Sequence, residues 1–240
     1  MSLKILALIL ARGGSTGVRL KNIRSLAGKP LIGYTIEVAK ASKYINRTIV
    51  ATDYTDIKNV AEQFGAEVPF MRPDEMSQKL SRAYDVYRYF LEKLKNEEHY
   101  WPDIVVLLFS TSYSKTVDEV DKAIKKLIET KCDWVFTVCE VEHHPYRFFT
   151  PTDDNRMENF CRNAKSHVIW GNRQELPLTY RINGNAFVTW TQNIEKHSTY
   201  NVDMVDYADS DVRYVVCPQE HSMDIDTELD FRFAEFLISQ

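Results

Sequence analysis

A glycine-containing segment with three basic residues is the part of this sequence best suited to chemistry. It covers residues 11–22 (ARGGSTGVRLKN) and directly follows an apolar stretch at residues 5–10. Glycines let a backbone turn tightly and bring its N–H groups close to a ligand, and successive amides form a concave anion site. Arg12, Arg19 and Lys21 add positive charge where phosphates would lie. The segment predicts a triphosphate-binding loop, although an ordinary glycine turn with basic surface residues has the same composition.

The spacing of this loop fits neither a Walker A motif nor the dinucleotide motif G-x-G-x-x-G. A nucleotide held here therefore requires a different kind of phosphate loop.

Two aspartates near the C-terminus form a second candidate site. Asp224 and Asp226 are two residues apart, so on an extended segment both side chains point to the same face. Mg²⁺ binds hard oxygen ligands and commonly takes one or two carboxylates together with phosphate oxygens. A structural alternative is that Asp226 or Thr227 caps the last helix, with Asp230 completing a capping box. That alternative leaves Asp224 without a role, so the pair predicts a magnesium site.

The elements that must position these residues alternate between buried strands and amphipathic helices. This order predicts an α/β fold with a mainly parallel central sheet and helices on both faces. Thr116 and Glu119 stand at capping-box spacing and predict where one helix begins. The expected strands are 5–10, 48–51, 67–71, 104–109, 133–138 and 213–217. The expected helices are 30–42, 53–64 and 81–95, with one after 116 and one after 225.

The alternation stops between about residues 140 and 180. This stretch contains His143-His144-Pro145 and several aromatic residues, and it predicts an insertion that leaves the main sheet. Adjacent histidines on a strand point to opposite faces, which argues against a shared zinc ion. We expect a single domain over residues 1–240 with this inserted subregion.

Composition excludes several classes of protein. The 240 residues carry a formal net charge of −4, whereas general nucleic-acid binders have a strong basic excess. The longest apolar runs have strand length, so neither a membrane span nor a signal peptide is expected. The four cysteines lack zinc-site spacing and indicate reduced thiols in the cytoplasm.

Several motifs together resemble one enzyme family. The segment ARGGS at 11–15, Lys21-Asn22 and GKPL at 28–31 are similar to the signature of the acylneuraminate cytidylyltransferases, which make CMP-linked sialic acids and related nonulosonic acids. The resemblance covers about residues 4–237 and implies a Rossmann-like nucleotidyltransferase fold. It continues at ATD 51–53, GAEV 65–68, Arg72-Pro73, EHHP 142–145, Arg173-Gln174, Leu176-Pro177, RING 181–184 and MDIDTELD 223–230.

The resemblance implies a role for each matching residue. For the nucleotide these are Ala11, Arg12, Gly13, Gly14, Ser15, Lys21, Asn22 and Arg72. For the sugar they are Arg181 and Asn183, with Phe109 at a further sugar position. Asp224 and Asp226 would hold Mg²⁺, and the catalytic residues would be Arg12, Lys21 and Asp226.

Four positions depart from the family pattern near the expected pocket. Phe109 stands where the family commonly has a glutamine thought to touch the sugar, and a phenylalanine cannot replace those hydrogen bonds. Losing one buried polar partner typically costs about 1–3 kcal/mol, enough to alter substrate choice. The other departures are Thr16, Lys115 and the segment around Lys79.

The expected reaction joins CMP from CTP to the anomeric hydroxyl of a nonulosonic acid, with release of pyrophosphate. The hydroxyl proton is expected to go to Asp226 or to a hydroxide bound to the metal. Two alternatives stay open, namely a different sugar acid or nucleotide, and a nucleotide-binding protein without catalysis. The resemblance also implies a homodimer in which each subunit helps to close the other's site. No nucleic-acid or membrane partner is expected.

Overall fold

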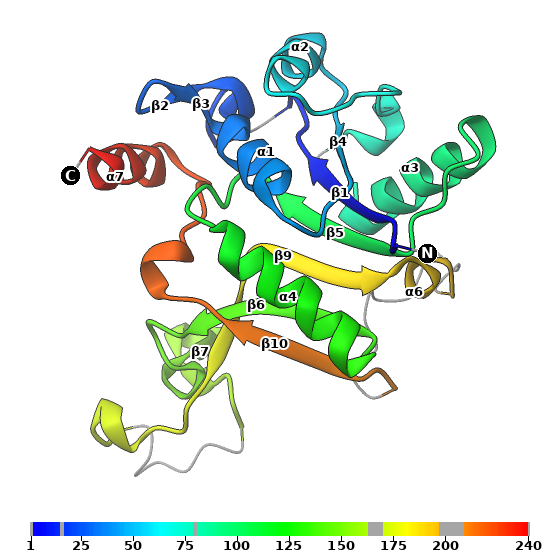
Figure 1. Ribbon diagram of the computed structural model, residues 1–240. Helices are drawn as coiled ribbons and strands as arrows, with labels where there is room; N and C mark the ends of the chain where they lie inside the picture. The colour runs from blue at the N-terminus through cyan, green and yellow to red at the C-terminus, as the bar shows by residue number, and fades with distance from the viewer. Residues whose placement is uncertain (1, 15–16, 79–80, 163–169, 197–208, 240) are drawn as a thin grey trace.

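A six-stranded sheet forms the centre of the molecule in the computed structural model, which describes residues 2–14, 17–78, 81–162, 170–196 and 209–239 (Figure 1). The strand order is β10-β6-β9-β5-β1-β4. Their bounds are β1 Ile5–Leu10, β4 Arg47–Ala51, β5 Ile104–Phe109, β6 Trp134–Glu140, β9 Tyr180–Trp190 and β10 Val212–Val216. Five of the six expected strands are therefore present in the sheet. The stretch 67–71 is the exception, because only Glu67 forms an isolated bridge, to Ile49.

The sheet is mixed because of one strand that the sequence pattern did not predict. β9 pairs antiparallel with both β5 and β6, whereas β1–β4, β1–β5 and β10–β6 are parallel pairs. β9 brings the end of the 140–180 insertion back through the middle of the sheet. The predicted, mainly parallel α/β sheet is thus confirmed with one antiparallel insertion.

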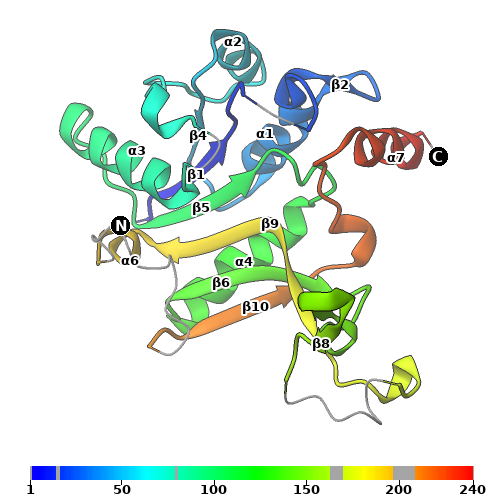
Figure 2. The same cartoon turned by 180° about the vertical axis from the view of Figure 1, so that it is seen from behind.

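Helices cover both faces of the sheet, as predicted (Figure 2). On one face, apolar side chains from three helices pack with Ile5, Ala7 and Ile9 of β1. On the other, two helices pack over Leu6 and Leu8. The first three helices are α1 Leu31–Ala41, α2 Thr55–Gln63 and α4 Val117–Thr130, and the other two are α3 Ala83–Glu97 and α6 Thr191–Lys196.

Two α-helices in the described part of the chain begin with full capping boxes. Thr116 caps α4 with Glu119, as the spacing predicted, and Thr227 caps the last helix, α7 Glu228–Ile238, with Asp230. The 3₁₀ helices are η1 Lys21–Ile23, η2 Asp74–Met76, η3 Pro145–Arg147, η4 Asp153–Asn155, η5 Arg173–Glu175 and η6 Gln219–His221.

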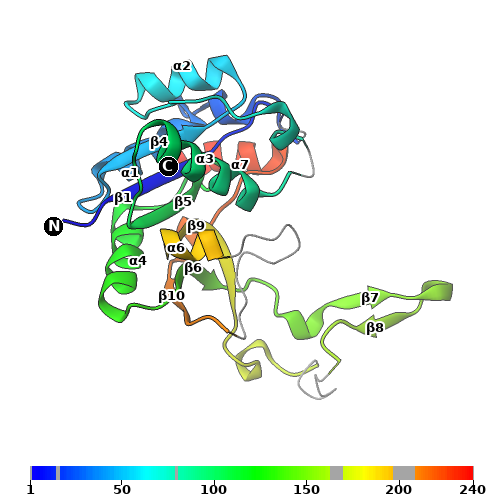
Figure 3. The same ribbon diagram turned by 90° about the vertical axis from the view of Figure 1, so that its right-hand side faces the viewer.

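The inserted subregion projects from the main sheet (Figure 3). It contains a separate hairpin of β7 Phe149–Pro151 and β8 Met157–Asn159. A second small hairpin, β2 Ser25–Leu26 with β3 Lys29–Pro30, follows the predicted phosphate loop. Among the helices that the structure describes, none combines the length and the apolar content needed to cross a bilayer.

Candidate active site at the carboxyl ends of the strands

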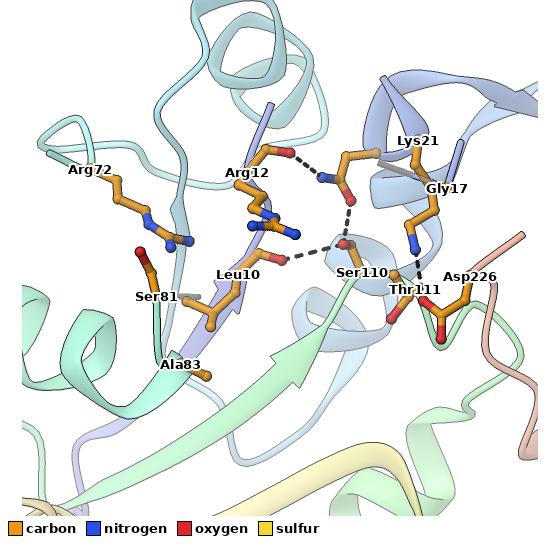
Figure 4. A pocket seen from close by; sticks show the side chains of 11 residues that line it. Leu10, Arg12, Gly17, Lys21, Arg72, Ser81, Ala83, Ser110, Thr111 and Asp226 are labelled. Carbon is orange, nitrogen blue, oxygen red and sulfur yellow. Dashed lines mark hydrogen bonds and ion pairs between the residues drawn. The ribbon is translucent and has the colours of Figure 1, made fainter. Parts of the chain in front are cut away.

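A cleft of about 480 Å³ opens where β1 and β5 end (Figure 4). Open α/β sheets bind ligands outside the carboxyl ends of their strands, so this is where the fold favours a substrate. Four predicted nucleotide-binding residues and one predicted metal ligand lie in its wall. The lining residues are Leu10, Arg12, Gly17, Lys21, Asn22, Arg72, Ser81, Ala83, Ser110, Thr111 and Asp226.

Hydrogen bonds hold the predicted phosphate loop on the strand ends. The N–H of Ala11 donates to Ala51 O over 3.1 Å and continues the pairing of β1 with β4. The N–H of Gly13 donates to Asp53 Oδ1 over 2.8 Å, which ties the loop to the turn after β4. Both contacts are made by backbone N–H groups of the loop, so the backbone fixes its position. The Ala11 side chain is buried.

Asn22 connects this loop to β5. Its Nδ2 donates to Arg12 O over 2.8 Å, and Ser110 Oγ donates to its Oδ1 over 2.5 Å. Asn22 is only 4% exposed, so its amide holds the two walls of the cleft together. Its predicted place near the nucleoside stays a prediction.

Three basic side chains, Arg12, Arg72 and Lys21, line the cleft. Arg12 donates to Gln78 O over 3.0 Å, and the guanidinium of Arg72 points toward the same region (Figure 4). Arg72 is 6% exposed and donates from Nε to Met76 O over 2.7 Å. Burial lowers the pKa of Arg72, and the nearby Arg12 lowers it further, while Asp53 raises it. Arginine stays protonated, so the cleft keeps its positive charge for an anion.

Lys21 joins the loop to the C-terminal acidic segment, residues 221–226. Its Nζ lies 3.1 Å from Asp226 Oδ1 and also donates to Ile225 O. The two chains approach so closely that a Cβ on Gly17 would lie 2.0 Å from Asp226 O. A side chain at position 17 would therefore push the acidic segment away from the loop.

The acidic segment has the alternating exposure that the aspartate spacing predicted. Asp224 and Asp226 are exposed on either side of the buried Ile225. Thr227, with Asp230, caps α7, so the cap and the aspartate pair are both present and Asp224 has no part in the cap. Within the described residues, three or more His, Cys, Asp or Glu side chains nowhere gather as a metal site would require. Asp226 lines the cleft, and two exposed carboxylates two residues apart fit Mg²⁺, which commonly takes one or two carboxylates together with phosphate oxygens and water.

The two predicted sugar-binding residues on β9 contact the acidic segment. Arg181 forms two hydrogen bonds with Glu142, of 2.9 and 2.6 Å, and donates to Ser222 O over 3.2 Å. Its hydrogen bonds hold the pKa of Glu142 below the usual value. Asn183, 3% exposed, donates to Ser222 Oγ over 2.8 Å. The structure brings both beside the segment that carries Asp224, and their contact with a sugar stays a prediction.

A buried polar network under this segment was not found from the sequence. Oε1 of Glu119 lies 2.8 Å from Nδ1 of His221, and Asn185 donates from Nδ2 to His221 O over 2.7 Å. Glu119 was predicted only as a helix cap, because the capping-box spacing explains its position without a second role. Its second carboxylate oxygen serves that cap, accepting the N–H of Thr116.

Two of the positions that depart from the family pattern are the last residue of β5, Phe109, and Lys115 in the loop that follows. Phe109 is half-buried, and its ring packs edge-to-face on Phe187 with 5.5 Å between centroids. Lys115 is buried and donates from Nζ to Thr35 Oγ1 over 2.9 Å, to Phe109 O over 2.8 Å and to Ser112 O. Burial lowers the pKa of Lys115 to about 7, against the attraction of Asp224 and Glu119.

Some predicted positions cannot be compared with the cleft. Ser15, Thr16 and Lys79 lie outside the described residues. Arg19 and Gly14 are exposed, and neither belongs to the cleft wall.

Conversely, Ser81, Ser110 and Thr111 line the cleft without having been predicted. Ser110 and Thr111 directly follow a predicted strand, and that position was the signal that could have identified them.

Comparison with known proteins agrees with this geometry. A model of the family described as cytidylyltransferase matches residues 6–195. The pseudaminic acid cytidylyltransferase of Campylobacter jejuni is 30% identical, over 98% of this chain and 96% of that protein. The N-acylneuraminate cytidylyltransferase B of Danio rerio is 31% identical over 95% of this chain, which spans about half the length of that relative.

The fold has a match among solved structures. A CMP:2-keto-3-deoxy-manno-octonic acid synthetase, solved in complex with CTP, superposes with a TM-score of 0.72. The match covers 99% of both chains at 16% identity, and it shows the shared fold alone. The family match covers most of the chain and includes the predicted phosphate loop, β5 and Asn183. The chain therefore belongs to the cytidylyltransferase family.

Proposed function

We propose that this protein transfers CMP from CTP to the anomeric hydroxyl of an acidic sugar of the nonulosonic type. The observation that carries the proposal is that Arg12, Lys21, Arg72 and the exposed Asp226 line one cleft. In such a cleft the three basic side chains attract the negative charge of a triphosphate, and the carboxylate of Asp226 lies in the same wall. The names of the relatives from Campylobacter jejuni and Danio rerio support the nucleotide and the class of acceptor.

The reaction forms one bond and breaks one bond at the α-phosphorus. The anomeric hydroxyl oxygen of the sugar attacks, the bond to the β-phosphate oxygen breaks, and pyrophosphate leaves with that electron pair. Arg12 and Lys21 stabilise the negative charge that develops on the phosphate oxygens. Their positions are set by the fold before the substrate binds, which lowers the cost of bringing the reactants together.

The hydroxyl proton must leave as the new bond forms. Asp226 is the exposed carboxylate of the cleft wall, and its side chain is 76% exposed, so it can accept this proton. Asp224 and Asp226 would also hold Mg²⁺, which when bound supplies Lewis-acid polarisation of the phosphate oxygens.

The proposal is tested by pyrophosphate release. The protein is incubated with Mg²⁺, each of CTP, ATP, GTP and UTP, and a panel of nonulosonic acids and shorter 2-keto-3-deoxy acids. Release with CTP and an acid, and formation of the CMP-sugar, is the expected result. CTP binding without release for every acid would contradict the proposed transfer and favour the open alternative of a binding protein.

We further propose that the inserted subregion forms a homodimer contact. Its large apolar side chains are exposed, with Phe160 at 65% and Trp170 at 80%. Size-exclusion chromatography with light scattering is expected to give twice the mass of 28.0 kDa, and a monomer mass would contradict this.

We also place the enzyme in the cytoplasm, since Cys132, Cys139, Cys161 and Cys217 are all free thiols.

A further inference from the structure

The acidic segment, residues 221–226, is held at its start by side chains from two other elements. Oε1 of Glu119, on α4, lies 2.8 Å from Nδ1 of His221. An ionised carboxylate only accepts hydrogen bonds, so Nδ1 of His221 is the donor. Asn185, on β9, donates from Nδ2 to His221 O over 2.7 Å and to Oε2 of Glu119 over 3.4 Å. We call Glu119, Asn185 and His221 the His221 network.

The helix cap alone does not account for a carboxylate at position 119. In the capping box Oε2 of Glu119 accepts the N–H of Thr116 over 3.0 Å, and a glutamine serves equally well in such a box. Glu119 is 5% exposed, and burying a carboxylate is costly unless hydrogen-bond donors surround it. The second oxygen therefore needs a donor of its own, which His221 supplies.

The network lies a few residues before the two aspartates of the predicted metal site. His221 precedes Asp224 by three residues and Asp226 by five. Near the other end of the segment, Ile225 is fully buried and donates its N–H to Thr111 O over 3.2 Å. The exposed carboxylates of Asp224 and Asp226 thus take their positions from a backbone that is held on both sides. Glu119 holds the first of these sides through His221.

We propose that Glu119 is a positioning residue that acts through His221 to keep Asp224 and Asp226 in the arrangement that binds Mg²⁺. The inference rests on the proposed cytidylyl transfer and names a residue that prepares its metal site. When the contact between Glu119 and His221 is lost, the segment occupies this arrangement for a smaller fraction of the time. The apparent affinity for the metal falls by that fraction.

The first measurement requires no turnover. Hydrogen exchange of the metal-free protein is followed by mass spectrometry in peptides that cover residues 217–227. His221→Leu removes the donor and is expected to speed exchange in these peptides by about tenfold or more, because the lost hydrogen bond is made to a charged group. His221→Asn places an amide N–H where Nδ1 of the ring stands, and it is expected to keep exchange close to that of the wild type.

The second measurement is the Mg²⁺ dependence of pyrophosphate release with CTP and an acid. His221→Leu is expected to raise the Mg²⁺ concentration for half-maximal turnover by about tenfold, because the segment must first be ordered. At saturating Mg²⁺ its kcat is expected to stay within about twofold of the wild type, since the bound metal restores the arrangement of the aspartates.

Two further variants separate the contact with His221 from the helix cap. Glu119→Gln keeps the capping box without the charge, and it is expected to change both quantities in the same direction by about threefold. Added to His221→Leu, it is expected to cause no further increase, because the two residues act as one pair. Thr116→Ala is the matched control. It removes the hydroxyl half of the cap, and it is expected to lower the urea midpoint of unfolding without changing either quantity.

Three outcomes overturn the inference. The first is unchanged exchange and Mg²⁺ dependence in the folded His221→Leu protein, and Glu119→Gln carries both measurements if that protein does not fold. The second is an equally large effect of Thr116→Ala, which would trace the change to general loss of stability. The third is a further increase when Glu119→Gln is added to His221→Leu, which would mean that Glu119 acts by another route. If no acid supports pyrophosphate release, the proposed function fails, and the exchange measurement still decides whether Glu119 holds the segment.

Discussion

Lys21 and Asp226 are 205 residues apart in the sequence, and their side chains are joined by a 3.1 Å ion pair at the cleft. Lys21 is 8% exposed, whereas the Asp226 side chain is 76% exposed. The lysine is therefore held by the fold, and the carboxylate remains open to a ligand. A phosphate arriving beside Lys21 meets a cation that is already in place, while the exposed Asp226 carboxylate can take up a metal ion.

Replacing Lys21 tests whether this cation stabilises the transferring phosphate. Lys21→Met is expected to lower kcat by about 10²-fold or more, because a preorganised charge is lost where negative charge develops. Lys21→Arg is expected to recover part of the rate. Pyrophosphate release measures the effect, and Lys122→Met, which loses only an exposed pair with Asp118, is the control. A Lys21→Met protein that folds normally and keeps full turnover would contradict the assigned role.

Replacing Asp224 or Asp226 is expected to change the Mg²⁺ dependence of turnover, whereas replacing another surface carboxylate is not. Asp226→Asn and Asp224→Asn should each raise the Mg²⁺ concentration required for half-maximal turnover, because each removes a charged oxygen ligand. Chelation by EDTA should stop turnover, and added Mg²⁺ should restore it. Asp118→Asn, also on the surface, is the matched control. The metal assignment fails if Asp226→Asn retains wild-type turnover and the same Mg²⁺ dependence.

Gly17 offers a test of the close approach between the loop and the acidic segment. In Gly17→Ala the new Cβ would meet Asp226 O at 2.0 Å, so the backbone at Asp226 must move. A displacement of about 1 Å at a catalytic site can cost 10²-fold in rate, and we expect a loss of about that size. Lys122→Ala, at an exposed position on α4 outside the cleft, is the control. Equal turnover of the two variants would argue against this contact.

Lys115 predicts a particular pH dependence of stability. Its pKa is about 7 in the folded protein and near the ordinary 10.5 after unfolding, so between these values the unfolded chain binds more protons. Stability therefore rises with pH across this window, by on the order of 1 kcal/mol per pH unit. Below pH 7 both states are protonated and the cost of burying the charge is fully present.

The measurement is urea unfolding of the wild type and of Lys115→Met from pH 6 to 10. The difference between their free energies of unfolding is expected to be constant below about pH 7 and then to shift in favour of the wild type. A difference that stays constant over the whole range would contradict the lowered pKa.

Local features of the sequence were sufficient for much of the fold. Strand β1 is a continuous apolar run, and the start of α4 follows from Thr116 and Glu119, because strand burial and helix capping depend on neighbours within a few residues. The loop after β1 was predicted to be a phosphate site for the same reason. Its glycines and basic residues are adjacent in the chain.

Long-range pairing decided what the sequence left open. β9 was not predicted, since its place between β5 and β6 depends on the register of two strands that are distant in sequence. The contacts of Asn183 with Ser222, and of Lys21 with Asp226, exist only because that sheet brings these segments together. The residue types capable of chemistry were therefore determined by the sequence alone. Which of them face one cleft was decided by the tertiary structure, because only packing across the sheet fixes distances between residues far apart in the chain.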